Sequence, residues 1–142
     1  MQDLEKIALF IQKHHVMSLA TSYENELSVC SLFYVYDDES RCFVVASSEK
    51  TQHINHIQKN KKIAGNILLE TETVSKIEGL QFRGEFKELQ NAALKKLYFK
   101  KFPYALAMLP TLWEIKIDFF KLTDNTLGFG KKLIWQETSA QT

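Results

Sequence analysis

Residues 27–60 read LSVCSLFYVYDDESRCFVVASSEKTQHINHIQKN. Two runs rich in aromatic and β-branched residues, 27–36 and 41–46, flank a polar turn at 37–40, which predicts an antiparallel hairpin. The second run leads directly into two serines and then into a segment whose isoleucines recur three residues apart, as on one face of a helix. The stretch therefore predicts strand, turn, strand and helix in close succession.

The same two signals continue on both sides of that stretch. The helices that we expect cover 3–14, 48–60 and 90–102, and the strands that we expect cover 16–21, 27–36, 41–46, 63–69, 80–87, 113–119 and 133–135. Gly79 and Gly84 in the fifth strand indicate a bulge or a close approach of two backbones. Short connections and strongly apolar strands favour a closed sheet without exposed edges. The expected fold is mainly β: a six- to seven-stranded antiparallel split β-barrel with about three peripheral helices.

Composition limits the class of protein. The chain has 142 residues and a formal net charge of +1, so we expect one domain over 1–142 whose polar tail, 136–142, frays. Its charge gives no support for nucleic-acid binding, and no apolar run approaches the roughly 20 residues of a membrane span. Without a signal-peptide pattern the expected location is the cytoplasm. Cys30 and Cys42 fall in expected strands and are interpreted as buried thiols, with a disulfide as the minor alternative.

The strongest chemical signal lies where the strand at 41–46 meets the following helix. Ser47, Ser48 and Lys50 gather hydroxyls and an ammonium group at a helix start, where unpaired backbone N–H groups carry partial positive charge. Such a combination predicts a cradle for a phosphate group. The commoner arrangement of the same residues is a serine cap beside a solvated lysine, and the pattern alone leaves both open.

The chain resembles the pyridoxamine 5′-phosphate oxidase-like FMN-binding split barrels. The matching segments are LSVCSLFYVYD at 27–37, FVVASSEKTQHINHIQKN at 43–60 and GLQFRGEFKEL at 79–89. The stretch WEIKIDFFKLTDNTLGFGKKLIW at 113–135 looks like the YhbP-like bacterial branch of that superfamily. The resemblance implies a homodimer with FMN at its interface.

The resemblance also implies individual roles. Residues beside the flavin ring would be Ser31, Leu32, Phe33, Ala46 and Ser47. Residues holding the phosphate would be Ser48, Lys50 and Thr51, with Gln52 reaching the ribityl chain or ring. Gln81 would come from the partner subunit, and Trp113 would pack near the same groove.

One residue departs from the family pattern. Glu49 stands where many relatives place an arginine, and a carboxylate repels a phosphate unless it points away. Another cation would have to replace that arginine, and the candidates are Arg83, Lys131 and Lys132. The chain also lacks the C-terminal arginine–histidine pair of the true pyridoxamine phosphate oxidases, so we do not expect that activity.

Other constellations are weaker. His53 and His56 share a helical face, but a metal site needs further ligands, and the preferred interpretation is two polar helix histidines without metal. The lysines of 90–102 are interpreted as a solvated face rather than a nucleic-acid contact. No hydrolase motif is present, so any catalysis would depend on a bound flavin.

The sequence thus favours an FMN-binding protein acting as a flavin-dependent oxidoreductase on a small molecule. Two alternatives stay open: a barrel that holds flavin or haem without turnover, and a cofactor-free interaction module. Among cofactors, F420 and haem rank behind FMN.

Overall fold

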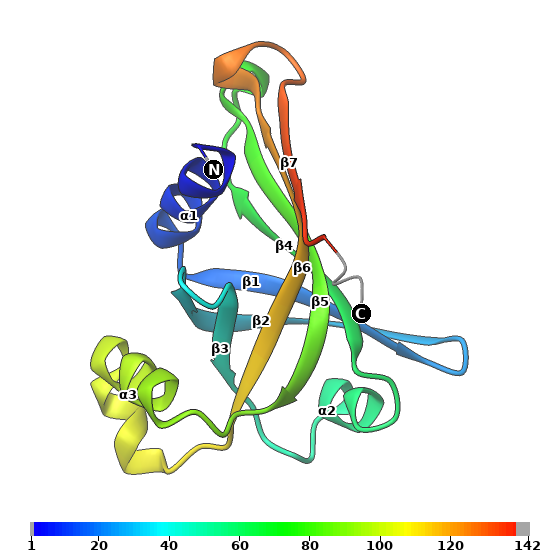
Figure 1. Cartoon of the computed structure of the whole chain (residues 1–142). Coiled ribbons are helices and arrows are strands. Elements are labelled where there is room, and N and C mark those ends of the chain that lie inside the picture. The colour runs from blue at the N-terminus through cyan, green and yellow to red at the C-terminus, as the bar shows by residue number, and fades with distance from the viewer. Residues whose placement is uncertain (1, 139–142) are drawn as a thin grey trace.

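Seven antiparallel strands dominate the computed structural model, which describes residues 2–138 (Figure 1). The strands are β1 Val16–Tyr23, β2 Glu26–Asp37, β3 Cys42–Ala46, β4 Lys62–Leu69, β5 Glu78–Glu88, β6 Leu112–Asp124 and β7 Lys132–Gln136. Their order in the sheet is β3-β2-β1-β4-β5-β6-β7, and β3 also pairs with β6. Six strands therefore close into a barrel, with β7 attached outside the ring, and the predicted fold is confirmed.

The sheet splits along β6. Its first part, Leu112–Lys116, pairs with β3, and its later part, Phe119–Thr123, pairs with β7. β6 extends beyond the predicted end at 119 because β5 and β7 both continue to pair with it. The predicted tail begins too early, since Gln136 pairs with Phe119 in β7. Residues 139–142 of the predicted tail lie outside the described residues.

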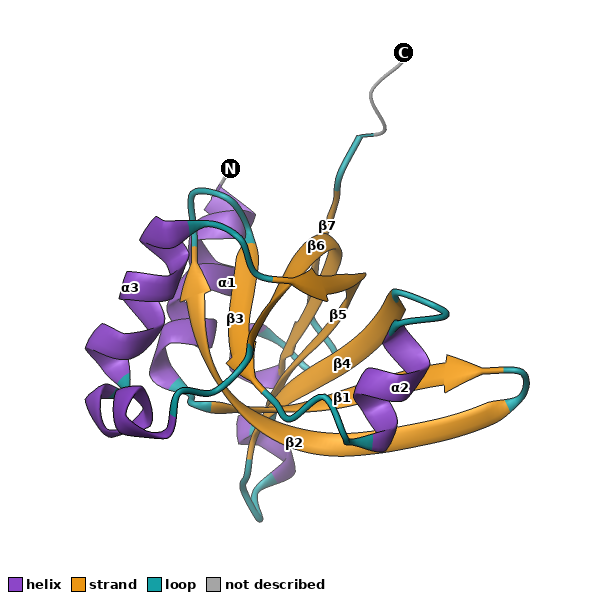
Figure 2. Cartoon of the chain, turned by 90° about the horizontal axis from the view of Figure 1, so that it is seen from below, coloured by secondary structure: helices purple, strands orange, loops and turns teal. Residues whose placement is uncertain are grey.

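Three α-helices lie around the barrel, as predicted (Figure 2). They are α1 Gln2–Lys13, α2 Gln52–Ile57 and α3 Ala92–Lys101. Three short 3₁₀ helices were not predicted: η1 Val74–Lys76, η2 Pro103–Met108 and η3 Asn125–Leu127. The longest of the described helices, α1, has 12 residues, and none in the described part is long and apolar enough to cross a membrane.

The first hairpin turns more tightly than expected. Glu24 and Asn25 have φ angles of 47° and 67°, so a two-residue turn joins β1 to β2. Two consecutive positive φ angles are typical of the turn type whose twist matches paired strands. The two strands therefore extend to 23 and from 26, into residues that were predicted to form a turn at 22–26.

Aromatic side chains fill the barrel. Tyr34, Phe43, Phe82 and Phe120 are almost completely buried, and the rings of Phe43 and Phe82 lie 5.0 Å apart between centroids. The Tyr34 hydroxyl donates to the carbonyl of Ile11, which ties α1 to the barrel. A second apolar cluster lies under α3, and its members are Val35, Cys42, Val44, Leu89, Leu94, Tyr98 and Leu112. The predicted free thiols are confirmed: Cys42 is buried, Cys30 is partly buried, and neither forms a disulfide.

Candidate functional site

A groove of about 630 Å³ opens beside the turn between β3 and α2. One wall is the turn, residues 46–50, and the other is the last residue of η2 with the three residues that follow it, 108–111. This volume is within the range of pockets that hold small molecules and cofactors. The turn that the sequence singled out thus lines a groove of suitable size.

Strand β6 fixes the turn from the barrel side. The backbone N–H of Ser47 donates to the carbonyl of Thr111 at 3.1 Å, and the indole Nε1 of Trp113 donates to the carbonyl of Ser47 at 2.9 Å. Trp113 is only 5% exposed and packs on Phe86. It therefore lies beneath the groove, next to Ser47, and its packing near a bound ligand stays a prediction.

Most hydroxyls of the turn are engaged within the protein. The Oγ of Ser47 lies 2.6 Å from Nε2 of His53. Thr51 caps α2: its Oγ1 accepts from the N–H of Ile54 at 3.4 Å and donates to the carbonyl of Ser48 at 3.0 Å. The exposed polar groups that remain on the groove wall are Ser48, Glu49 and Lys50. Because α2 has only six residues, these side chains, rather than a helix dipole, must provide any affinity for an anion.

An exposed aromatic ring lies next to the groove. Tyr34 pairs with Val45, so continuing the register by one residue places Phe33 opposite Ala46. Phe33 is 59% exposed, and its ring lies 6.0 Å from that of Phe102, which precedes η2. Ser31 is exposed on the same face, whereas Leu32 packs against the core. The structure thus brings together most of the residues predicted beside a planar ring, and Leu32 can contribute only its backbone.

Proteins of known sequence resemble the chain along nearly its whole length. A UPF0306 protein of Klebsiella pneumoniae subsp. pneumoniae is 40% identical over 139 residues, covering 96% of this chain and 95% of that protein. The UPF0306 protein YhbP of Escherichia coli O6:H1 is 37% identical over 139 residues, covering 96% of this chain and 99% of that protein. The chain belongs to the UPF0306 family. The resemblance to YhbP inferred from 113–135 is confirmed, although no protein-family model matches the chain.

Solved structures share the fold of this UPF0306 chain. A haem-binding protein of Mycobacterium smegmatis has a TM-score of 0.77 at 12% identity, covering 94% of this chain and 57% of that one. A NimC/NimA family protein of Clostridium acetobutylicum has a TM-score of 0.72 at 14% identity, with coverages of 94% and 92%. An FAD-binding protein of Mesorhizobium loti has a TM-score of 0.68 at 14% identity, with coverages of 83% and 90%. At these identities the similarity establishes the split-barrel fold.

Several predicted residues of the UPF0306 chain lie away from the groove. Gln52 turns toward the β1–β2 hairpin, where its Nε2 lies 3.1 Å from Nε2 of His56 and 3.5 Å from Glu26. Gln81 is exposed on β5, three strands from β2 in the sheet order. At a strand spacing near 4.8 Å that is about 14 Å across the face. Within one chain, neither residue is brought to the groove.

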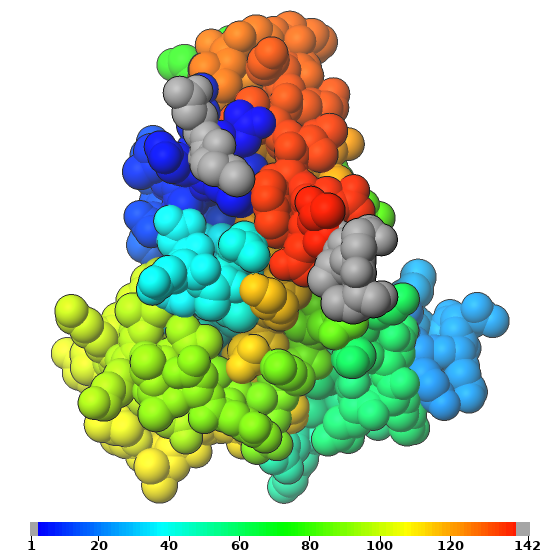
Figure 3. Space-filling view, viewed as in Figure 1, coloured from blue at the N-terminus to red at the C-terminus, as the bar shows by residue number. Residues whose placement is uncertain are grey.

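The two loop lysines lie at the opposite end of β6. Lys132 pairs with Thr123, whereas Thr111 at the start of the strand lines the groove. Thr123 lies twelve residue steps along the chain from Thr111, which immediately precedes β6, and this corresponds to roughly 40 Å of extended chain. Figures 1 and 3 show the β6–β7 loop in orange at the top, far from α2 and the segment after η2 at the bottom. Within one chain, Lys131 and Lys132 are therefore not brought to the groove, and their replacing the missing arginine at a shared site stays a prediction. Arg83 lies over Phe119 on the β4–β5–β6 surface, and it does not line the groove either.

The two histidines lie on α2, as predicted, but sequence reasoning did not anticipate their burial. His53 and His56 are 7% and 2% exposed. His56 Nδ1 lies 2.9 Å from Oγ1 of Thr21, and burial, with a smaller effect of His56, lowers the pKa of His53 below its usual value. Within the described residues no three His, Cys, Asp or Glu side chains gather as a metal site requires. The signal that was available is that His53 falls on the same helical face as the buried Ile57.

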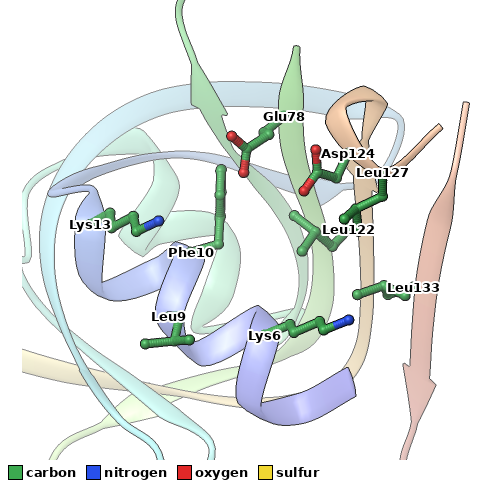
Figure 4. Close-up of a pocket in the computed structure, with 9 residues that line it drawn as sticks. All are labelled: Lys6, Leu9, Phe10, Lys13, Glu78, Leu122, Asp124, Leu127 and Leu133. Atoms are coloured by element: carbon green, nitrogen blue, oxygen red, sulfur yellow. The ribbon is translucent and has the colours of Figure 1, made fainter. Parts of the chain in front are cut away.

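A second, smaller cleft of about 170 Å³ lies between α1, the start of β5, the end of β6 and the start of β7 (Figure 4). The carboxylates of Glu78 and Asp124 face it from paired positions of β5 and β6, and Lys6 and Lys13 face it from α1. It contains no residue predicted to bind a cofactor. Burial, with Asp124 adding to it and Lys13 opposing it, raises the pKa of Glu78.

Replacing Glu78 with glutamine is expected to stabilise the protein at neutral pH. A raised carboxyl pKa in the folded state means that stability is greatest below the unfolded-state pKa and falls as pH rises through the folded-state pKa. Removing the repulsion of a like-charge cross-strand pair should raise the free energy of unfolding by about 0.2–1 kcal/mol. The melting temperature should then rise by about 1–3 °C. Thermal unfolding of Glu78→Gln at pH 7.5 and pH 4 measures the gain, which should disappear at pH 4. The exposed Glu88→Gln on the same strand is the control, and an equal gain there would contradict this assignment.

Proposed function

We propose that this chain binds FMN in the groove beside the β3–α2 turn and acts as a flavin-dependent oxidoreductase on a small molecule. The observation that supports this most is the arrangement around the groove: an exposed aromatic ring, Phe33, lies on the strand beside Ala46, and the wall that includes Ala46 presents Ser48 and Lys50. The aromatic ring would contact the flavin ring, and the hydroxyl and the ammonium group would contact the phosphate, in the order in which these groups occur in FMN.

The residues of the groove wall include the types that bind a phosphate group, but their net positive charge is small. Lys50 supplies one positive charge, and Glu49 on the same wall offsets it. Phosphate sites normally combine several charge-assisted hydrogen bonds. The groove therefore has the chemistry for a phosphomonoester, and a further donor would strengthen it. A bound flavin supplies hydride transfer, for which protein side chains alone are not suited.

The wall chemistry favours flavin over haem. Similar folds are described for both haem-binding and FAD-binding proteins, so the fold does not distinguish the two ligands. Haem iron needs an axial ligand, most often histidine. Among residues 2–138, no histidine lines this groove, and His53 and His56 are buried and hydrogen-bonded. Met108 is the one thioether on the wall.

A second copy of the chain would complete the site. The outer face of β1, β2 and β4 exposes a set of apolar side chains, which are Val16, Leu27, Val29, Phe33 and Leu68. Exposed apolar surface of this kind marks protein interfaces, and a two-fold pair would use the same face on both copies. Gln81 of the same chain lies three strands away from β2, so in the proposed dimer the partner's Gln81 would approach the groove.

Replacing Val29 with glutamate is expected to convert the dimer to monomer. Val29 is 72% exposed in the single chain, and a two-fold interface would bring two new carboxylates close together. Like charges buried against each other cost several kcal/mol, so the dissociation constant of the dimer should rise about 100-fold or more. Size-exclusion chromatography with light scattering checks this. Leu9→Glu on α1 is the matched control, because Leu9 is also exposed but lies off this face, and a wild-type monomer would contradict the shared site.

The function is tested by the small molecule that the purified protein holds. We expect a yellow protein with flavin absorption bands, and quenching of FMN fluorescence when the stripped protein is titrated with FMN. Anaerobic NAD(P)H should bleach the bound flavin, as an oxidoreductase requires. Retained flavin without bleaching would favour a binding module, and the absence of any flavin, haem or F420 binding would leave the interaction module.

A further inference from the structure

The proposed FMN site lacks a strong second cation, and the structure holds a basic group directly behind it. His53 lies on α2 under the turn, with its Nε2 2.6 Å from the Oγ of Ser47 and 3.3 Å from the Oγ1 of Thr51. Its ring is 7% exposed, so it reaches the groove only through those hydroxyls. Ser47 lines the groove itself.

The Ser47 hydroxyl lies between the His53 ring and the groove. The backbone N–H of Ser47 donates to Thr111 and its carbonyl accepts from Trp113, so its hydroxyl, which contacts His53 and lies 3.4 Å from the Oγ1 of Thr51, is the polar group of Ser47 that can turn toward the groove. A serine hydroxyl has one hydrogen to donate and two lone pairs to accept with. The direction in which that hydrogen points therefore decides what Ser47 presents to a ligand in the groove.

We propose that His53 is a positioning residue that couples phosphate binding to proton uptake through Ser47. This inference rests on the proposed function. When Nε2 carries no hydrogen, Ser47 donates to it and presents only lone pairs to the groove, which repel an anion. When His53 is protonated, both ring nitrogens carry hydrogens, Nε2 donates to Oγ, and the Ser47 hydroxyl donates outward to the phosphate.

The groups facing His53 set the pH at which this happens. His56, one turn along α2, disfavours a second positive charge, and it in turn lies 3.6 Å from Glu26 of β2. Lys50 and Glu49 on the turn offset each other, and β1 contributes Thr21, bonded to His56, and no carboxylate. Burial and, to a smaller extent, His56 lower the pKa of His53, which favours the neutral ring in the unliganded protein. A dianion in the groove favours the charged ring, and binding should therefore tighten as pH falls.

His53→Gln tests the coupling, because a glutamine amide can bond Ser47 but does not titrate. We expect FMN to bind the wild type and the variant with similar Kd at pH 8. At pH 5.5–6 the wild type should bind about tenfold more tightly than the variant, as expected for a hydrogen bond that becomes charge-assisted. The second ionisation of the FMN phosphate, near pH 6, affects both proteins and cancels in the ratio.

Three further measurements make the result decisive. Riboflavin, which lacks the phosphate, should give a ratio that does not change with pH. His56→Gln should keep the pH dependence but shift it to higher pH, because His56 lowers the pKa of His53. Calorimetry of FMN binding to the wild type in two buffers of different ionisation enthalpy should detect proton uptake, and it needs no variant to fold. A pH-independent ratio without proton uptake overturns the role of His53, whereas failure of both proteins to bind FMN at any pH overturns the proposed function.

Discussion

Lys50→Glu is expected to abolish FMN retention, with affinity falling about 100-fold or more. Lys50 is exposed on the groove wall and provides its one ammonium group, so the change removes a charge-assisted hydrogen bond. It also leaves two adjacent carboxylates, Glu49 and the new residue, facing a dianion. Fluorescence titration with FMN measures the loss.

The control for that experiment is a matched charge reversal elsewhere. Lys96→Glu on α3 changes the net charge equally at an exposed position away from the groove, and FMN affinity should stay within about twofold of the wild type. Riboflavin should bind Lys50→Glu about as well as it binds the wild type, because the ring end of the groove is unchanged. Undiminished FMN binding by Lys50→Glu would mean that the phosphate lies elsewhere.

The location of the groove could be predicted, but the orientation of its side chains could not. A strand running into serines and a helix start identified the turn at 46–51 from sequence alone. That Ser47 bonds inward to His53, and Thr51 to its own helix, depends on tertiary packing that residue types do not encode. The segment after η2 was missed because a short 3₁₀ helix leaves no amphipathic period in the sequence.

The distance between the groove and the loop lysines within one chain could not be predicted, for a geometric reason. Lys131 and Lys132 were candidates because they are cationic and lie in a family-like segment, yet β6 runs the whole height of the molecule between the groove and their loop. Sequence reasoning had ended β6 at 119, five residues short of its observed end at Asp124. Because each strand residue advances the chain by about 3.3 Å, that error alone moves the loop by roughly 16 Å.

Glycines in β5 show which backbone details a sequence can indicate. Both Gly79 and Gly84 predicted a bulge or a close approach, and only Gly84 has one: the register between β5 and β6 shifts between Arg83 and Gly84. A Cβ at Gly84 would lie 2.2 Å from the carbonyl oxygen of Lys116, whereas a Cβ at Gly79 would meet a leucine methyl at 3.6 Å. The missing side chain is therefore required at one position and not at the other.

Gly84→Ala is accordingly expected to destabilise the barrel by about 3 kcal/mol or more, because the clash is with backbone that is paired on both sides. Lys116 pairs with Glu85 of β5 and also with Cys42 of β3, so it cannot shift without opening the strand junction that closes the ring. For a chain of this size the melting temperature should fall by roughly 10 °C. Gly79→Ala is the internal control, since ordinary van der Waals contact leaves its stability within about 1 kcal/mol of the wild type. Equal melting temperatures for the two variants would show that β6 can move at the bulge, and the closed β3–β6 junction would then not be the rigid element on which the turn at Ser47 depends.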